Sequence, residues 1–495
     1  MSSLRGREVE VATVEAGRTN GGDRVLSARD PRTGEQDYRF SPPGEAELNG
    51  MAAAARAAQP AWSALGFEGR GAILRDFAAA LDASRPALGA ALERDTGRRR
   101  IAYLEIDSVI GSIARWTQVA PGLLEEGWTA GQRQPHLRHA PQWSPYPLVG
   151  VISPWNFPLL LSMIDAIPAL LAGCAVIIKP SEVTPRFAAP LADAIAAIAP
   201  LQAVFHLAPG DGPVGQALID RVDCVCFTGS VPTGRKVAMQ AASRLIPAFL
   251  ELGGKDPLIV LEGADLDAAV DAALRGSVLS TGQACQSIER IYVHGSLHDA
   301  FLERLRERAA AVRLNWPDIE QGDIGPIIFE RQAEILAEQI ADARNKGARV
   351  LTGGEIERHG GGLWLRPTVL GDVRHDMKVM TEETFGPLLP VMAFDTPGEA
   401  VALANFGDYG LSAAVFGPDV EAAEAIGRQL EAGAVSLNDA ALTALFHEAP
   451  KQSFKASGLG PSRMGPEGLA RFFRRKALIA NTGRPAPLAA FAEDG

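Results

Sequence analysis

The stretch that decides the fold is residues 147–180, which read PLVGVISPWNFPLLLSMIDAIPALLAGCAVIIKP. It is the most apolar region of the chain, but three prolines, Asn156 and Asp165 interrupt it, so it does not form an unbroken membrane helix. Val149–Ser153 and Ala175–Lys179 are apolar runs of strand length on either side of a helix-like segment. Two apolar strands joined by a helix are typical of a parallel sheet covered on both faces.

The same alternation continues towards the C-terminus. Residues 45–131, which precede it, have apolar positions at spacings of three and four and predict amphipathic helices. The alternation predicts two successive α/β domains with a cleft between them: a Rossmann-like parallel-sheet domain and a second α/β domain. The further strand-like runs are Val204–Leu207, Val222–Phe227 and Ala248–Glu251 in the first series, and Pro257–Leu261, Arg290–His294, Ala413–Phe416 and Ala434–Asn438 in the second.

Two segments fit neither series. Residues 132–146 are rich in prolines and alternate in polarity, and the tail from 477 to 495 is similarly detached. We expect them to form a small β arm for self-association. The predicted domains are therefore 1–131 with 147–252, 253–450, and this arm with its tail.

Composition excludes several classes of protein. A chain of 495 residues has room for about three domains. Its net charge of −11 would repel a nucleic-acid backbone. Four cysteines are too few for a disulfide framework, and the N-terminus lacks the apolar core of a signal peptide, so we expect a cytoplasmic protein.

Three residues are candidates for catalysis, although each has an ordinary structural explanation in isolation. Cys285 ends the sequence Gly-Gln-Ala-Cys, and a lone cysteine in such a segment is usually core packing. Glu251 ends a predicted strand before a Gly-Gly turn, where side chains project into the cleft of an α/β sheet, although surface glutamates also end strands. Asn156 follows another strand between two prolines, and its amide is a suitable donor to an oxyanion or a cap for a turn.

Two motifs predict a dinucleotide. Residues 227–234, FTGSVPTG, lead from a strand through a glycine turn into a helix, as in pyrophosphate sites, but lack a full GxGxxG pattern. Lys179 and Glu182 in KPSE fit the two hydroxyls of a ribose, and this carboxylate favours NAD over NADP; a solvated charged turn is the alternative. We expect no metal site, because Cys224 and Cys226 lack a second pair of ligands.

Residues 150–470 resemble the aldehyde dehydrogenase superfamily, in its hydrolytic branch. The segments SPWNFP, KPSE, FTGS, ELGGK and GQAC are followed by EETFGP at 382–387, YGL at 409–411 and KASG at 455–458, in the order of the family. The 34 residues from Glu251 to Cys285 also match its spacing.

The resemblance implies specific roles. Cys285 would attack the aldehyde carbon, Asn156 and the Cys285 N–H would hold the oxyanion of the thiohemiacetal, and Glu251 would activate the water that hydrolyses the thioester. The expected cofactor is NAD, with NADP as an option. Its contacts would be Trp155, Lys179, Ser181, Glu182, Gly212, Phe227, Gly229, Ser230, Leu252, Gly253, Glu383 and Phe385.

The resemblance also implies a homodimer or homotetramer with a small-molecule aldehyde as substrate, without nucleic acid or membrane as partners. Phe157, Leu161, Ile164 and Phe446 would line the entrance and favour an apolar or aromatic aldehyde. A semialdehyde is the alternative substrate. A non-catalytic scaffold that retains the fold is the alternative function.

Three departures from the family pattern stand out. Lys451-Gln-Ser-Phe454 replaces a common Phe-Gly-Gly stretch near the substrate mouth. Ser280 stands where an Asn is frequent, and we expect this change to be tolerated. Asp165 and Arg463 stand where many members have a Lys and a Glu, so we expect an ion pair of opposite polarity, with two unrelated surface charges as the alternative.

Overall fold

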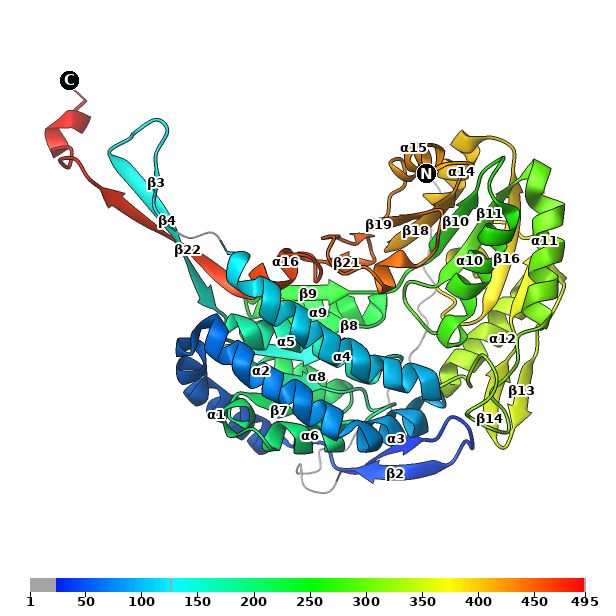
Figure 1. The fold of residues 1–495 in the computed structure, drawn as a ribbon, viewed down its shortest axis with the longest axis horizontal. Helices are drawn as coiled ribbons and strands as arrows, with labels where there is room; N and C mark the ends of the chain where they lie inside the picture. Colours follow the sequence, from blue (N-terminus) through cyan, green and yellow to red (C-terminus); the bar gives the residue numbers. More distant parts are fainter. Residues whose placement is uncertain (1–23, 125–126, 494–495) are drawn as a thin grey trace, which may run out of the picture.

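The structure is a computed structural model that describes residues 24–124 and 127–493. Two largely parallel sheets with helices on their faces form the body of the molecule, and a three-stranded antiparallel arm extends away from it (Figure 1). The predicted α/β fold with a small β arm is confirmed. Among the described residues, no helix has the length and apolar character needed to span a membrane.

The first sheet has the strand order β21-β9-β8-β5-β6-β7. Neighbouring strands from β9 to β7 are parallel, and only β21 joins antiparallel, with Gly458 opposite Glu251. All residues of β5, β6 and β8 are buried, as expected of strands covered on both faces. The strands are β5 (Leu148–Ile152), β6 (Ala175–Lys179), β7 (Phe205–Leu207), β8 (Cys224–Thr228), β9 (Ala248–Glu251) and β21 (Gly458–Leu459).

Nine helices of the described chain precede or alternate with these strands. Leu74, Phe77, Ile106 and Trp116 from them enter the same core as the strands, and such side chains each contribute roughly 1.5–3 kcal/mol. The helices are α1 (Glu45–Ala64), α2 (Gly66–Ala83), α3 (Arg85–Thr96), α4 (Arg99–Val119), α5 (Pro158–Ala172), α6 (Ala188–Ala196), α7 (Ala199–Gln202), α8 (Gly212–Ile219) and α9 (Val231–Ser243).

Helix α5 shows how local sequence sets the borders of an element next to the site. It begins at Pro158, which has no N–H to leave unpaired, and it ends before Gly173, whose φ of 104° suits glycine. The buried Glu105 of α4 accepts hydrogen bonds from the backbone N–H groups of Leu159 and Leu160, both at 3.0 Å. The carboxylate thereby satisfies donors that the helix itself leaves free.

The second sheet has the order β12-β15-β16-β11-β10-β18-β19, parallel except for β12 with β15. Its strands are β10 (Asp256–Val260), β11 (Ile288–His294), β12 (Arg349–Val350), β15 (Thr368–Gly371), β16 (Leu388–Phe394), β18 (Ser412–Phe416) and β19 (Ala434–Leu437). The later helices are α10 (Leu266–Val278), α11 (Gly295–Ala310), α12 (Glu330–Asn345), α13 (Lys378–Thr381), α14 (Pro397–Ala404), α15 (Val420–Gly427) and α16 (Glu467–Ala470).

The arm consists of β3 (Thr129–Ala130), β4 (Leu137–Pro145) and β22 (Phe473–Asn481). Strand β22 pairs with β4 from Phe473 opposite Pro145 to Asn481 opposite Leu137. Short antiparallel pairs join β1 (Leu26–Arg29) to β2 (Gln36–Phe40), β13 (Ile356–His359) to β14 (Gly362–Leu365), and β17 (Tyr409–Gly410) to β20 (Phe454–Lys455). The 3₁₀ turns are η1 (Ala120–Gly122), η2 (Leu279–Gly282), η3 (Leu442–Ala444) and η4 (Leu488–Phe491).

The structure differs from the sequence expectations mainly in the arm. The region predicted as helical to residue 131 leaves helix after Gly122, and Thr129–Ala130 is already a strand of the arm. Strand β22 begins at Phe473, ahead of the predicted start at 477, because it pairs with β4 along its whole length. Helical periodicity carries no information about such a distant pairing. Residues 1–23, 125–126 and 494–495 of the predicted segments lie outside the described residues.

Candidate active site

One cavity of about 250 Å³ collects Cys285, Glu251 and Asn156. Asn156 follows β5, Glu251 ends β9, and Cys285 lies between the 3₁₀ turn η2 and β11. The cavity thus draws on segments next to both sheets. In α/β proteins, side chains that follow the carboxyl ends of parallel strands project into the same crevice, which explains how three distant residues meet.

Asn156 is held firmly at the cavity wall. Its side chain is buried, and its Nδ2 donates to the carbonyl oxygen of Gln283 at 3.0 Å. The buried Arg98 donates to the carbonyl oxygen of Asn156. Gln283 is fixed in turn, since its amide donates to the carbonyl oxygen of Pro326 at 3.1 Å and accepts from the N–H of Ile328 at 2.9 Å. The Asn156 amide therefore faces the loop that carries Cys285.

The loop before Cys285 has an unusual backbone. Ser280, Thr281 and Gly282 have φ values of 58°, 61° and 67°, and the non-glycine residues of such a run store strain on the order of 1–3 kcal/mol each. A Cβ on Gly282 would lie 2.4 Å from the carbonyl carbon of Gly386, so the tight approach also needs glycine. Strain of this kind is held by its surroundings and often accompanies function.

Cys285 as a residue is partly exposed, and the surroundings of its thiol determine its ionisation. Burial raises the pKa of Cys285 to about 11, while Lys451 and Arg463 oppose this effect and Asp256 and Glu251 add to it. A thiolate is the reactive form, so the balance between these charges sets its reactivity. Within the described part of the chain, the backbone N–H of Cys285 donates to no other backbone or side-chain group, which leaves it available to a ligand.

The predicted ion pair between Asp165 and Arg463 is confirmed. Nη2 of Arg463 lies 3.2 Å from Oδ2 of Asp165, both side chains are buried, and Arg463 also donates to the hydroxyl of Thr228 at 2.6 Å. Asp165 has a second cationic partner, Arg471. The Nε of Arg463 lies 3.6 Å from Oε1 of Glu251, so this network reaches the candidate base.

Lys179 and Glu182 come together as the sequence predicts for a ribose-binding pair. Lys179 ends β6, and its ammonium donates to the carboxylate of Glu182 at 3.3 Å and to the carbonyl oxygen of Gly210 at 2.7 Å. Burial lowers the pKa of Lys179. Ser181 between them accepts from the N–H of Val183 at 3.2 Å, which shapes the turn.

The turn between β8 and α9 fits a pyrophosphate. Ser230 is the N-cap of α9 and makes no capping bond with its side chain, so the first N–H groups of this 13-residue helix stay available to an anion. A Cβ on Gly229 would lie 2.5 Å from the ring of Phe227, so the close turn needs glycine. Gly212, also predicted as a contact, is the first residue of α8. The N-terminus of α9, the glycine turn before it and the pair of Lys179 with Glu182 together suit a dinucleotide.

Glu383 lies beside the Gly253–Gly254 turn that follows Leu252. Its Oε1 accepts from the N–H of Gly254 at 3.1 Å, and a Cβ on Gly253 would meet this carboxylate at 2.4 Å. Burial and the charge of Glu289 raise the pKa of Glu383 to about 8. A protonated carboxyl donates as well as accepts, which suits the hydroxyls of a second ribose.

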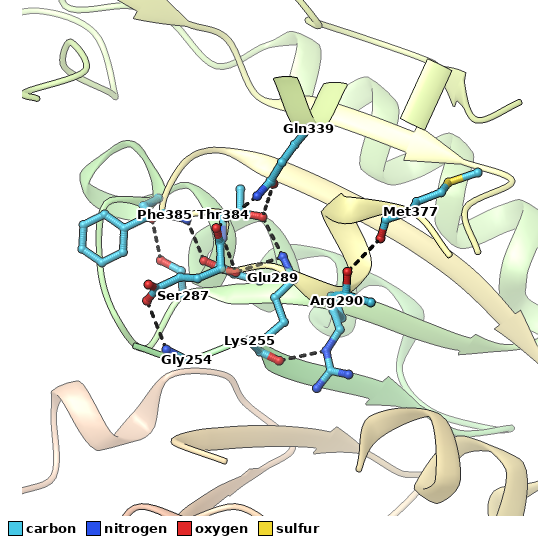
Figure 2. Close-up of polar contacts among 12 residues, drawn as sticks. Gly254, Lys255, Ser287, Glu289, Arg290, Gln339, Met377, Thr384 and Phe385 are labelled. Atoms are coloured by element: carbon cyan, nitrogen blue, oxygen red, sulfur yellow. Dashed lines mark hydrogen bonds and ion pairs between the residues drawn. The ribbon is translucent and has the colours of Figure 1, made fainter. Parts of the chain in front are cut away.

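A buried ion pair between Lys255 and Glu289 supports residues 384–385, which follow Glu383 (Figure 2). Glu289 accepts from the ammonium of Lys255 at 3.0 Å and from the N–H groups of Thr384 and Phe385 at 2.7 and 2.8 Å. These bonds hold Phe385 at a φ of 50°. The rings of Phe385 and Trp155 then meet edge to face, 5.3 Å between centroids. Glu289 is not among the residues predicted from the sequence, although a Glu-Arg pair within the apolar strand 288–294 was a signal.

The cavity wall is largely apolar. Three of the predicted substrate residues, Phe157, Leu161 and Ile164, line the cavity. Leu104 and Met464, which were not predicted, also line it. Phe446 does not line the cavity: the residue is 56% exposed, while Leu445 and His447 on either side of it line the cavity. A loop without regular periodicity gave no basis for choosing among these neighbours.

Comparisons with known proteins identify the family of this chain. The model of the aldehyde dehydrogenase family matches residues 18–478. A Mycolicibacterium smegmatis protein named as a succinate-semialdehyde dehydrogenase (NADP(+)) is 37% identical, over 87% of this chain and 83% of its own length.

Two solved structures are similar over almost the whole fold. One is an aldehyde dehydrogenase called PutA from Anabaena variabilis, with 52% identity, a TM-score of 0.92, and coverage of 94% of this chain and 99% of that one. The other is a betaine aldehyde dehydrogenase from Staphylococcus aureus in complex with NAD+, with 30% identity, a TM-score of 0.88, and coverage of 95% and 96%. This chain therefore belongs to the aldehyde dehydrogenase family and is an NAD(P)-dependent oxidoreductase.

Proposed function

We propose that this enzyme oxidises an aldehyde to the carboxylic acid through a thiohemiacetal and then a thioester on Cys285, with water as the acyl acceptor. The observation that carries the proposal is the meeting of Cys285, Glu251 and Asn156 at one cavity. A nucleophile, a base and an oxyanion donor are the three groups that this sequence of steps requires.

In the first step, the sulfur of Cys285 attacks the aldehyde carbon. Because burial raises the pKa of this thiol, its proton has to be taken up, and Glu251 in the same cavity is the available base, directly or through a water molecule. The negative charge that develops on the substrate oxygen is held by Nδ2 of Asn156 and the N–H of Cys285.

In the second step, the carbonyl re-forms as a thioester. Bound NAD supplies the acceptor for the hydride that leaves the substrate carbon. Glu251 releases the thiol proton to solvent and, as a carboxylate again, takes a proton from water as the water oxygen attacks the thioester carbon. The acid then leaves with the sulfur restored as thiolate. The guanidinium of Arg463, 3.6 Å away, keeps the Glu251 carboxylate at the cavity.

The proposed cofactor contacts are the residues that the sequence motifs predict. Lys179, Ser181 and Glu182 would hold the adenosine ribose, and the turn of Phe227, Gly229 and Ser230 the pyrophosphate, with Gly212 at the start of α8 as a further contact. Trp155, Leu252, Gly253, Glu383 and Phe385 would hold the nicotinamide side. The Glu182 carboxylate would repel a 2′-phosphate, so we propose a preference for NAD over NADP.

The substrate would have an apolar or aromatic body, which the wall of Phe157, Leu161 and Ile164 supports. A semialdehyde is the second candidate, supported by the name of the mycobacterial relative.

We also propose a homo-oligomer, because the arm exposes Ile479 (73%) and Leu478 (41%) on a strand with a free edge. Residues 1–131 with 147–252 would form the NAD-binding domain, 253–450 the catalytic domain, and 132–146 with 477–495 the arm and tail.

The deciding experiment is NADH formation with a panel of aliphatic, aromatic and carboxylate-bearing aldehydes, with identification of the acid product. Turnover with at least one aldehyde is expected. NAD binding without NADH from any aldehyde would favour the scaffold instead. Size-exclusion chromatography with light scattering, before and after removal of residues 473–495, tests the oligomer.

A further inference from the structure

Lys451 places a positive charge in the wall of the substrate cavity. The residue is only 8% exposed, and it lines the same cavity as Cys285. Its backbone N–H donates to the hydroxyl of Ser462 at 2.9 Å, which fixes the chain at this point. The charge is close enough to the thiol to lower the pKa of Cys285 more than any other group opposing its burial.

The two arginines of the cavity wall already have carboxylate partners. Arg463 pairs with Asp165, and Arg275 pairs with Asp439. In residues 24–124 and 127–493, by contrast, no carboxylate lies within 4.0 Å of the Lys451 ammonium, as the ion pairs of that region show. A largely buried ammonium without an anion is unfavourable, so the site is electrostatically incomplete.

The acids nearby have other partners. The carboxylate of Asp256 accepts from the N–H and the hydroxyl of Ser412. Burial raises the pKa of Asp256 to about 7, and the charge of Lys451 opposes this rise. Glu251 faces Arg463 at 3.6 Å, which compensates its charge. An anion entering the cavity would therefore find one unmatched cation in it.

Much of the wall is apolar, with Leu104, Leu160, Ile164, Leu445 and Met464. Glu105 also lines the cavity, but its carboxylate accepts from the backbone N–H groups of Leu159 and Leu160. A single charged group in an apolar pocket orients a ligand and selects its chemistry. An aldehyde with only an apolar body would leave Lys451 unmatched and would have to desolvate it further.

We propose that Lys451 binds a carboxylate on the substrate, so that the enzyme selects aldehydes that carry both an apolar chain and a carboxylate, the ω-oxo acids. This inference rests on the proposed function and narrows its substrate class. Lys451 is then a specificity-determining residue, and its ammonium orients the aldehyde towards Cys285.

The test compares each ω-oxo acid of increasing length with its methyl ester, which has the same chain without the charge. In the parent enzyme, kcat/KM for the best acid should exceed that for its ester by about 10- to 100-fold, as for a hydrogen bond between charged groups. Lys451→Met should abolish this preference, while any slowing that comes from the thiol ionisation should be equal for acid and ester; Lys451→Arg should retain most of the preference. Lys346→Met, which breaks a pair with Asp342 at the C-terminal end of α12, is the control of equal charge change.

Alkylation of Cys285 gives a readout that needs no turnover. Iodoacetate and iodoacetamide differ in charge but react with the same thiolate. The ratio of the iodoacetate rate to the iodoacetamide rate therefore reports on anion binding beside Cys285. Lys451→Met should lower this ratio about tenfold or more, and Lys346→Met should not change it.

Equal kcat/KM for acid and ester in the parent enzyme, or an unchanged alkylation ratio in Lys451→Met, would overturn the inference. In that case Lys451 affects only the ionisation of the thiol, and its replacement slows alkylation by both reagents alike. Failure of the proposed function has a different signature: no aldehyde yields NADH, even if the iodoacetate preference is present.

Discussion

The guanidinium of Arg463 lies between two carboxylates, 3.6 Å from Glu251 and 3.2 Å from Asp165. Asp165 pairs with Arg471 as well as with Arg463. Arg463 therefore remains charged and fixed beside the candidate base. The polarity of the pair, with an aspartate on α5 and an arginine after β21, thus keeps a permanent cation next to Glu251. Arginine holds its proton at all working pH values, so Arg463 positions Glu251 rather than exchanging protons with it.

Cys285→Ala should reduce NADH formation to background with every aldehyde, because no other group in the cavity supplies a sulfur nucleophile. NAD binding and the melting temperature should stay close to the parent values. Steady-state NADH formation and a thermal melt check this. Substantial residual turnover would show that another residue is the nucleophile.

Glu251→Gln should separate the two halves of the reaction. The first half still yields a burst of about one NADH per active site, and the thioester then persists because no base activates water. Rapid mixing records the burst, and intact-protein mass spectrometry should detect the acyl group on Cys285. Turnover at the parental rate would contradict the role of Glu251.

Asn156→Ala should lower kcat by about 10²- to 10³-fold, the effect of losing one oxyanion donor. KM should change much less, because the amide acts mainly on the developing charge. Steady-state kinetics on a good substrate measure the split. A change confined to KM would assign Asn156 to ground-state binding.

Asp165→Ala should destabilise the fold by about 3–5 kcal/mol, since it leaves Arg463 and Arg471 buried without their carboxylate. Urea unfolding gives the difference. Asp323→Ala, which breaks the surface pair with Arg313, is the matched control and should cost about 1 kcal/mol or less. Similar losses in both variants would mean that the buried network contributes little.

The pH profile of Cys285 alkylation should follow its raised pKa. In the parent, the rate with iodoacetamide should still be rising as pH approaches about 11, because burial disfavours the thiolate. Glu251→Gln removes a negative charge that disfavours the thiolate further, so its profile should move to lower pH. A shift to higher pH would give the opposite sign and exclude Glu251 as a neighbour of the ionising thiol.

The strands, the α/β class and the cofactor motifs were predictable because they depend on local order in the sequence. Every predicted strand occurs with borders within two residues, for example Ala175–Lys179 and Ala248–Glu251 without any shift. Short apolar runs that alternate with helical segments are typical of buried parallel strands covered on both faces. The Asp165 and Arg463 pair was predictable only from the departure in the family pattern, since 298 residues separate the two.

Tertiary structure alone decided the other surroundings of the basic residues at the cavity. The sequence predicted that Arg463 pairs with Asp165, but only packing also brings Arg463 to 3.6 Å from Glu251 and places Lys451 in the wall of a largely apolar cavity. The extent of β22 and the exclusion of Phe446 from the cavity wall were decided in the same way. Periodicity reports which side of an element is buried, whereas the energy of a charge depends on what distant segments bring within a few ångströms of it.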